Sequence, residues 1–464
     1  MKRKFFAFIL LLMAGLSLSS CLSSDDDTNI EYTHDTAITA FSLGTLTRYY
    51  KGVSSTTGND TTYSAEVTGS SYKFYIDQAT RQIYNVDSLP VGSKSSAVLA
   101  TITAKNSSPL VWVLKDKDNK DSLSYYSSSD SIDFSSPRQI RVYNNDFSAY
   151  ATYTITVNVH KEGPDSFVWR SLAQQDAELA ALTDMKALAA GDAIYVFGKA
   201  AGKLKIYQSA NTDGRSWKTV EPNVSFSEEA YKSAIAKNDV IYILDGGTVY
   251  QSKDAVSWTE VAVDASLVQL IGASTKFLYA YTAAGISVSK DNGVTWTPEA
   301  LDADAANLPT KSLSLTVAPI RSTQNAENLL LLGNRDESMQ DSIATLWTHV
   351  VDYNEGASSD KWNYVAYDAV QGGKLPYLSA IQAAVNDSGY VAIGAGKFGE
   401  KYQCKWYKSK TGLKWSVDTT VVMPVEFNVN MPVAFVRDSN HYYWVINNGN
   451  VWKGRYNRDG WRKD

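Results

Sequence analysis

The sequence predicts an all-β protein, with an immunoglobulin-like β-sandwich followed by a six-bladed β-propeller. Short runs of alternating apolar and polar residues fill the first third of the chain. A turn motif that ends in tryptophan then recurs through the remainder, and each copy is accompanied by an apolar run. Tyrosine (29 residues) and tryptophan (12 residues) are frequent, which is typical of β-rich proteins.

Length and charge narrow the functional classes. A chain of 464 residues is too long for one ordinary core and suits two or three domains. Its formal net charge of −5 leaves no excess of lysine and arginine to neutralise phosphates. We therefore expect no nucleic-acid partner. We also expect no cofactor, since no cofactor-binding motif is present, and a monomeric protein.

The first 20 residues are predicted to be a lipoprotein signal peptide. Basic residues at 2–4 precede the apolar stretch 5–16, which is too short to span a bilayer core of ~30 Å. Ser19 and Ser20 then precede Cys21, and this arrangement resembles the lipobox of bacterial lipoproteins. The resemblance implies cleavage before Cys21 and acyl chains attached to it, which are sufficient to anchor a protein to a membrane. The alternative is an ordinary cysteine beside an ordinary signal-peptidase site.

Residues 21–32 are predicted to form an acidic tether. Asp25, Asp26 and Asp27 cannot pack into a core and stay solvated. The run resembles the acidic export signal of Bacteroidota surface lipoproteins, which implies a lipid-anchored protein on the exposed side of the outer membrane. The alternative is a flexible tether with no role in export.

Residues 33–161 are predicted to form the β-sandwich. Residues 150–160 alternate strictly, with Tyr153 and Ile155 on one face and Thr154 and Thr156 on the other, as in a half-buried strand of an antiparallel sheet. Further strands are expected at 38–45, 72–77, 81–86, 97–104, 110–115 and 138–144. About seven strands over roughly 130 residues is typical of an immunoglobulin-like sandwich. Residues 162–165, which contain Gly and Pro, are expected to be a linker.

Several stretches resemble a known family. The segments DTAITAFSLGTL (35–46), FYIDQATRQIYNVDSLPVGS (74–93), VLATITAKN (98–106) and YTITVNVHKEGPD (153–165) are similar to Bacteroidota lipoproteins of the domain-of-unknown-function family 6242. The likeness extends through the second domain. It implies an architecture and a surface location, but no activity, substrate or catalytic residue.

A repeated turn defines the second domain. Residues 289–296 read SKDNGVTW and match the Asp-box pattern S-x-D-x-G-x-x-W at each fixed position. Ser289 and Asp291 are expected to hydrogen-bond to backbone amides of the turn, and Gly293 to adopt a left-handed conformation. Trp296 is expected to be largely buried between sheets, so these four residues are structural. Related turns, between 38 and 66 residues apart, end at Trp217, Trp258, Trp362, Trp415 and Trp461.

Six blades are predicted within residues 166–464. An apolar run typical of an inner strand occurs at 193–198, 240–246, 277–282, 328–333, 390–396 and 442–446. Little chain follows Trp461, so residues 166–172 are expected to supply the outer strand of the last blade and close the ring. Residues 173–190 are rich in helix-forming residues and are expected to include a short helix.

The Asp-box (BNR) propeller resembles that of sialidases. The resemblance implies that, in a sialidase, three arginines would converge on the carboxylate of the substrate. Only Arg321, Arg335 and Arg437 are expected to face the propeller centre, and the sialidase F-R-I-P motif is absent. We therefore predict no catalytic residue.

The sequence predicts no metal site. The four histidines are isolated from one another, which does not fit metal-ligand spacing. Asp336, Glu337 and Asp341 offer calcium-type ligands but form no EF-hand pattern. With Cys21 lipidated, Cys404 has no partner and is expected to be a buried, inert thiol.

Two loops are candidates for a ligand-binding face, opposite the box turns. Residues 334–342 offer Arg335, Asp336 and Glu337, and residues 397–403 offer Lys397, Phe398 and Tyr402. The simplest alternative is two long loops with incidental side chains. The favoured hypothesis is a non-catalytic recognition module that binds a glycan or a protein through the propeller. The alternatives are a glycoside hydrolase acting on host or dietary glycans, and a structural accessory subunit of an outer-membrane complex.

The lipobox interpretation makes a direct prediction. The Cys21→Ala variant should not incorporate an alkyne fatty acid, because the acceptor thiol is gone, and should leave the membrane or keep its signal peptide. Continued labelling of this variant would refute the interpretation.

The acidic run makes a second prediction. Replacement of Asp25, Asp26 and Asp27 by Ala should leave fatty-acid labelling intact and, if the run directs export, should remove protease accessibility on whole cells. Unchanged protease accessibility would show that the run is only a tether.

Overall fold

The computed structural model describes residues 35–460 apart from 55, 116–117, 119, 355, 357–359, 367–371 and 399–400. The predicted signal peptide, the tether with Cys21, Asp25, Asp26 and Asp27, and the last box residue, Trp461, lie outside the described residues. The chain divides between Gly163 and Pro164 into two compact units. In the described part of the chain, no helix is long and apolar enough to cross a membrane.

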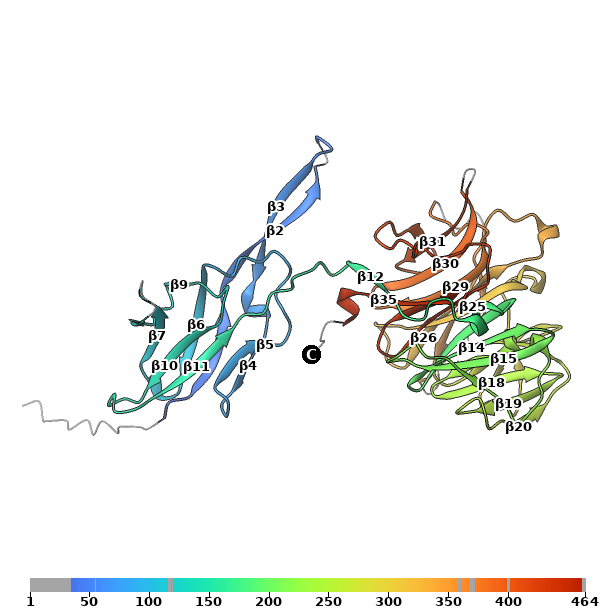
Figure 1. Ribbon diagram of the computed structural model, residues 1–464, viewed down its shortest axis with the longest axis horizontal. Helices are drawn as coiled ribbons and strands as arrows, with labels where there is room; N and C mark the ends of the chain where they lie inside the picture. The colour runs from blue at the N-terminus through green and yellow to red at the C-terminus, as the bar shows by residue number, and fades with distance from the viewer. Residues whose placement is uncertain are drawn as a thin grey trace, which may run out of the picture. The chain divides into compact units, whose positions relative to one another are not determined.

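The first unit is built from three sheets (Figure 1). The three-stranded sheet has the order β1 (Ile38–Leu43), β6 (Val98–Ala104), β9 (Ser131–Ile132). The six-stranded sheet has the order β4 (Phe74–Asp77), β5 (Gln82–Asn85), β11 (Tyr150–Thr156), β10 (Arg138–Tyr143), β7 (Leu110–Lys115), β8 (Asp121–Tyr125). The third sheet is a two-stranded ribbon of β2 (Thr45–Val53) and β3 (Asp60–Thr68).

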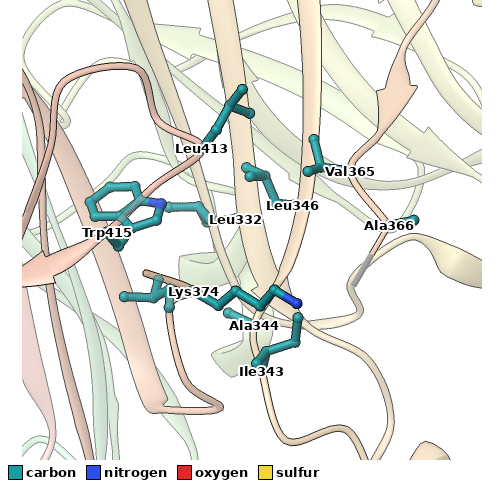
Figure 2. A pocket seen from close by; sticks show the side chains of 10 residues that line it. Leu332, Ile343, Ala344, Leu346, Val365, Ala366, Lys374, Leu413 and Trp415 are labelled. Atoms are coloured by element: carbon teal, nitrogen blue, oxygen red, sulfur yellow. The ribbon is translucent and has the colours of Figure 1, made fainter. Parts of the chain in front are cut away.

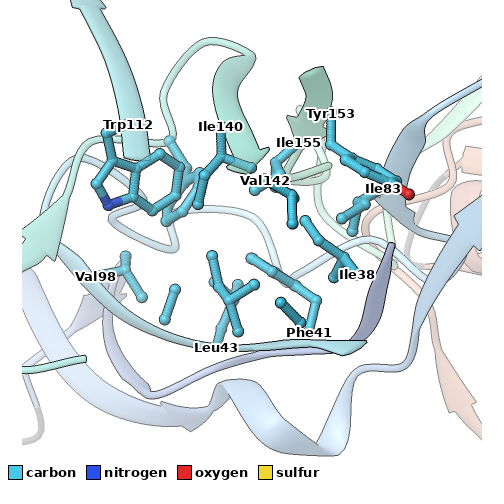
Figure 3. Packing of buried hydrophobic residues seen from close by; sticks show 14 of the residues in the cluster. Ile38, Phe41, Leu43, Ile83, Val98, Trp112, Ile140, Val142, Tyr153 and Ile155 are labelled. Atoms are coloured by element: carbon cyan, nitrogen blue, oxygen red, sulfur yellow. The ribbon is translucent and has the colours of Figure 1, made fainter. Parts of the chain in front are cut away.

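The core of this unit lies between the first two sheets. Figure 3 shows Phe41 and Leu43 facing Ile140 and Val142, with Trp112 at one end of the cluster. The alternation along β11 holds, because Tyr153 and Ile155 are buried while their neighbours are only half-buried. Two sheets that enclose one apolar core form the predicted sandwich.

The structure differs from the predicted sandwich in two places. The β2–β3 ribbon was not predicted, because most of its residues are polar on both faces; it projects beyond the two larger sheets (Figure 1). Strand β11 also ends at Thr156, before residue 160, and pairs antiparallel to β10 but parallel to β5. The purely antiparallel sheet that alternation suggested is therefore wrong in this detail.

The second unit contains six four-stranded sheets, the blades of a propeller (Figure 1). The first three are β13 (Asp184–Ala190), β14 (Ala193–Ala200), β15 (Lys203–Ala210), β16 (Lys218–Val220); β17 (Ile235–Lys237), β18 (Val240–Asp245), β19 (Thr248–Ser252), β20 (Thr259–Val263); and β21 (Leu267–Ala273), β22 (Leu278–Thr282), β23 (Gly285–Ser289), β24 (Thr297–Pro298). The next two are β25 (Lys311–Pro319), β26 (Ala326–Asn334), β27 (Thr345–Asp352), β28 (Asn363–Tyr364); and β29 (Ser379–Asn386), β30 (Gly389–Phe398), β31 (Lys401–Ser409), β32 (Ser416–Val417). The last is β33 (Val433–Arg437), β34 (Tyr443–Asn447), β35 (Asn450–Tyr456), β12 (Phe167–Ser171).

The last sheet takes its outer strand from the start of the unit. Strand β12 pairs antiparallel with β35 from Phe167 opposite Tyr456 to Ser171 opposite Trp452. An apolar cluster fills each of the six interfaces between neighbouring sheets, including the interface between the last sheet and the first. The sheets therefore form a closed ring, and the predicted apolar runs are the second strand of each sheet, flanked by strands on both sides.

Four of the box turns share an indole-to-carbonyl hydrogen bond, whereas the indole of Trp362 donates to the carboxylate of Glu299. Ser289 Oγ accepts from Gly293 N (2.7 Å), Asp291 Oδ1 accepts from Thr295 N (2.9 Å), and Trp296 Nε1 donates to the Gly293 carbonyl (3.2 Å). The turn glycine, Gly293, has a φ of 96°, which favours glycine. The same indole-to-carbonyl bond recurs at Trp217, Trp258 and Trp415.

The box tryptophans are not equally buried. Trp258, Trp362 and Trp415 are buried, whereas Trp296 is only half-buried. Trp296 packs against the apolar cluster between the second and third sheets, as expected, but it is less buried than these three. The match to the sequence pattern reflects the hydrogen bonds of the turn, while burial depends on the side chains that the neighbouring sheet presents.

The short helix expected within residues 173–190 is present, and the last seven residues of this segment form a strand. Only α2 (Ala177–Ala180) is helical, and the side chain of Asp176 caps it by accepting from two backbone amides. Residues 184–190 form β13, because pairing with β14 and packing against the last sheet outweigh the intrinsic helix propensity of their alanines.

The difference in burial yields a prediction about stability. Trp258→Ala removes a side chain that is only 3% exposed and should lower the free energy of unfolding by ~3–5 kcal/mol. Trp296→Ala, its matched control in the same motif, should cost less than ~2 kcal/mol because part of the ring already faces water. Thermal melts of the purified chain measure both, and equal losses would contradict the assignment of Trp258 to the interface.

Candidate functional site

The six innermost strands surround a central channel. Its volume is about 740 Å³, and its walls come from β13, β17, β21, β25, β29 and β33 and the residues next to their ends. Five of these strands are the first of their sheet in chain order, and β33 is the first of the three consecutive strands that β12 completes. All six therefore run in the same direction along the channel axis. The mouth at their starting ends lies opposite the box turns and next to the predicted ligand loops; we call it the upper mouth.

Charged side chains in the channel wall are mostly basic. The lining includes Lys186, Lys232, Lys311 and Arg437 but only two acids, Asp184 and Asp438. This balance is opposite to that of the whole chain, whose net charge is −5. A cleft lined by one sign of charge raises the local concentration of ligands of the other sign.

Lys186 is the most unusual of these cations. It lies in the middle of β13, is half-buried, and donates from Nζ to the Lys232 carbonyl at 3.1 Å. In the described part of the chain it has no carboxylate within ion-pair distance. Burial lowers the pKa of Lys186 to about 8. The group therefore carries its charge near neutral pH without a countercharge from the protein.

The first predicted loop is held in place by its own charges. Arg335 forms a bidentate ion pair with Asp341, at 2.8 Å from Nε and 2.6 Å from Nη2, and neither side chain is well exposed. Asp336 and Glu337 remain exposed and lie 3.6 and 3.3 Å from Lys311 Nζ at the upper mouth. Arg335 therefore has a structural role in this loop, whereas the two acids line the approach to the channel.

The second predicted loop is instead a β-hairpin. Residues 389–398 and 401–409 pair as β30 and β31, so Lys397 and Phe398 belong to a strand; their side chains lie outside the described part. Tyr402 is 44% exposed and its hydroxyl is 2.6 Å from Ser379 Oγ, at the start of innermost strand β29. The loop assignment is wrong, because the ladder continues almost to the turn, but Tyr402 does reach the upper mouth.

The three arginines that were expected at the centre do not meet. Arg321 donates to the carbonyl of Asp387, and Arg335 binds Asp341 in the loop described above. Only Arg437 lines the channel, near its other mouth, where its guanidinium lies 3.7 Å from Asp459. This arrangement cannot form a three-arginine carboxylate site.

The chain matches two family models, both of one family. The model described as "DUF6242 beta propeller domain" matches residues 163–464, and "Domain of unknown function (DUF6242) N-terminal domain" matches residues 41–157. The chain belongs to the DUF6242 family. This confirms the resemblance seen in the sequence and agrees with a sandwich followed by a propeller. A comparison with curated proteins gives no match.

Solved structures similar to this DUF6242 protein are distant. A thermostable family-43 glycoside hydrolase is 10% identical with a TM-score of 0.32, covering 53% of this chain and 95% of that chain. The Aleuria aurantia lectin in complex with Fucalpha1-6GlcNAc is 11% identical (TM-score 0.35; 57% and 87% covered). The Niastella koreensis GH74 enzyme is 13% identical (TM-score 0.31; 68% and 47% covered). Similarity at this level assigns no ligand or activity to the DUF6242 chain.

Among the residues that the structure describes, two acids line the channel of this DUF6242 propeller. The two acids of its described lining lie toward opposite ends, since Asp184 begins β13 and Asp438 follows the end of β33. Asp438 is also occupied, because its carboxylate accepts from Tyr442 N and from Trp444 Nε1. Glycosidases need two carboxyl groups within about 10 Å across the scissile bond.

The requirements of a metal site and of a reactive thiol can also be compared with the described residues. Among the residues that the structure describes, no three His, Cys, Asp or Glu side chains come together as metal ligands. Asp341, one of the calcium-type candidates, is bound by Arg335 instead. Burial raises the pKa of the Cys404 thiol to about 12, so it stays protonated near neutral pH.

A second, much smaller cavity lies between the fourth and fifth sheets in chain order. Figure 2 shows Trp415 and Leu413 on one side of it and Leu332, Leu346 and Val365 on the other. Its volume is about 30 Å³, which is roughly the space of one water molecule. It is a packing gap, and the channel remains the candidate site.

The position of Lys186 predicts an unusual pH dependence of stability. An unfolded lysine has a pKa near 10.5, and the folded value is about 8, so folding disfavours the charged form. This penalty is fully present below pH 8 and fades as the pH rises toward 10.5. Lys186→Met should therefore raise the free energy of unfolding at pH 7 by ~1–3 kcal/mol, with no gain at pH 10.5. Denaturant titrations at both pH values measure this, and a destabilised variant at pH 7 would contradict it.

Proposed function

We propose that this protein is a non-catalytic recognition module that binds a glycan at the upper mouth of the propeller channel and is held at the cell surface by a lipid on Cys21. The observation that carries the proposal is the channel, a concave space of about 740 Å³ with polar side chains along its wall. Ligand sites for small molecules commonly measure ~300–1,000 Å³. A protein partner would favour a flatter surface of ~800 Å² on each side.

The channel wall supplies hydrogen-bonding groups suited to sugar hydroxyls. Ser312 Oγ accepts from Ala380 N (3.2 Å) and Ser314 Oγ accepts from Ala383 N (2.9 Å), so both oxygens are fixed in position. Their hydroxyl protons remain available to donate. Tyr402 adds an exposed aromatic ring at the upper mouth, which suits the apolar face of a sugar.

Binding is favoured over hydrolysis by the acids of the channel. One of the two, Asp438, already accepts two hydrogen bonds from the protein, and the other, Asp184, lies toward the opposite end. Glu229 also lies near Asp184, since both acids act on the Tyr231 hydroxyl, but it is occupied by ion pairs with Lys199 and Lys232. It is therefore not a free general acid, base or nucleophile. The proposal is therefore recognition without bond cleavage.

The proposal predicts glycan binding that depends on Tyr402. The purified full-length chain should bind a subset of glycans on an array, and Tyr402→Ala should weaken that binding by about tenfold, because one stacking surface is lost. The melting temperature should change little, since the ring is 44% exposed. Tyr125→Ala, which removes a ring 71% exposed in the first unit, is the matched control and should bind normally. Absence of binding to any glycan would overturn the proposal.

A further inference from the structure

We infer that the ligand of this channel is an acidic glycan, and that its carboxylate or sulfate binds between the ammonium group of Lys186 and the amide group of Gln269. The inference rests on the proposed function and specifies the charge of the ligand and the residues that read it. Three observations lead to it: the convergence of the two donors, the missing countercharge, and the basic balance of the channel wall.

The two donors converge from different sheets. Lys186 lies in β13 and Gln269 in β21, yet both donate to one acceptor, the carbonyl of Lys232, at 3.1 and 3.2 Å. An ammonium group has three N–H bonds and a primary amide has two, so each side chain keeps a donor beyond this contact. Both side chains line the channel. A ligand oxygen in the channel next to this carbonyl can therefore receive two hydrogen bonds.

The other channel cations already have acidic partners. Lys232 lies 2.6 Å from Glu229, Lys311 lies 3.3 Å from Glu337, and Arg437 lies 3.7 Å from Asp459. Lys186 is without such a partner among the described residues. Its charge is therefore the one that an incoming anion would neutralise.

Asp184, the acid of the same strand β13, does not pair with Lys186 among the described residues. Asp184, two residues before Lys186, lies close to the hydroxyl of Tyr231, and its charge contributes to raising the pKa of that hydroxyl, which burial mainly raises. Side chains two residues apart on a strand share a face, so an ion pair between Asp184 and Lys186 would be easy to form. Among the described residues no such ion pair is present, and the ammonium group of Lys186 lines the channel.

A neutral sugar would leave this arrangement incomplete. A hydroxyl oxygen can accept a hydrogen bond from Lys186, but it leaves the positive charge uncompensated in a partly desolvated channel. A carboxylate or sulfate both accepts the hydrogen bonds and neutralises the charge, and charge-assisted bonds are the stronger kind. The chemistry of the site therefore selects an anionic group on the glycan.

The test compares acidic and neutral oligosaccharides on the full-length chain. Oligogalacturonate supplies carboxylates, chondroitin sulfate oligosaccharides supply sulfates as well, and galactan oligosaccharides of equal length are the neutral probe. Calorimetry should show binding of at least one acidic probe and at least tenfold weaker binding of the neutral one. Lys186→Met should weaken acidic binding by about 10- to 100-fold. The matched control is Lys218→Met, in the outer strand β16 of the same sheet, which should bind normally.

A pH series separates Lys186 from the rest of the channel. Because burial lowers the pKa of Lys186 to about 8, acidic binding by the wild type should fall at least tenfold between pH 7 and 9.5. Lys186→Arg should keep its affinity over that range, since a guanidinium stays protonated. Asp184, Lys232, Lys311, Arg437 and Asp438 also line the channel and are common to both proteins, so the difference reports on position 186.

The outcomes distinguish the two proposals. Acidic binding that Lys186→Met abolishes supports both. Equal or preferred binding of galactan, or acidic binding that Lys186→Met leaves intact, overturns the inference and leaves glycan recognition standing. Failure of every probe and every arrayed glycan overturns glycan recognition and the inference with it. A folded melt of each variant accompanies the titrations, so that loss of binding is not confused with loss of the fold.

Discussion

Closure of the ring is the constraint on which the propeller depends. Strand β12 lies almost 300 residues before its partner β35, and this pairing alone completes the last sheet. Phe167 of β12 also packs against the rings of Trp406 and Tyr456, at 5.5 and 5.2 Å between centroids, so closure adds to the neighbouring interface. Without β12, the last sheet would have an open edge. The channel exists because the ring closes.

Close approach at this junction restricts the sequence. A side chain at Gly454 would place its Cβ 2.6 Å from the ring of Phe167 and 2.8 Å from the Val168 carbonyl, distances that real Cβ atoms do not show. Arg458, just beyond β35, binds Asp165, just before β12, and also donates to Ser388 Oγ in the fifth sheet (3.0 Å). Three features therefore hold β12 and β35 together: the small residue Gly454, the ion pair of Arg458 and the backbone hydrogen bonds.

Much of this architecture follows from local patterns. The turn motif specifies a tight hydrogen-bonded hairpin from a few adjacent residues, and the second strand of each sheet is flanked by strands on both sides, so it appears as an apolar run. The innermost strands are harder to predict from hydrophobicity. One of their edges faces the channel, so their residues are less uniformly apolar. Strand β13 shows this best: its sequence MKALA favours a helix, and pairing with β14 makes it a strand.

The candidate site was harder to foresee for the same reason. Lys186 is a single charge among alanines, and on a helix it would simply face water; only the strand register places it in the channel wall beside a residue 83 positions later, Gln269. Not all of the predicted ligand residues are available at the channel mouth. A charged side chain in a loop can pair with a neighbour in the same loop, as Arg335 does with Asp341. The position of Tyr402 between the two middle strands of its sheet correctly predicted that it lies at the upper mouth, although the segment forms a hairpin and not a loop.

At position 186 the stability of the fold and the proposed recognition of an anion make opposite demands. The fold requires an innermost strand that packs on both sides, and an aliphatic side chain at position 186 would meet that need without the penalty of a half-buried, unpaired ammonium group. Elsewhere in the channel the protein has matched its cations with carboxylates, at 2.6 Å for Lys232 and 3.3 Å for Lys311. Among the described residues, carboxylates neutralise three of the four channel cations, and packing does not account for the exception at Lys186. The anionic ligand proposed for the channel would supply the missing countercharge.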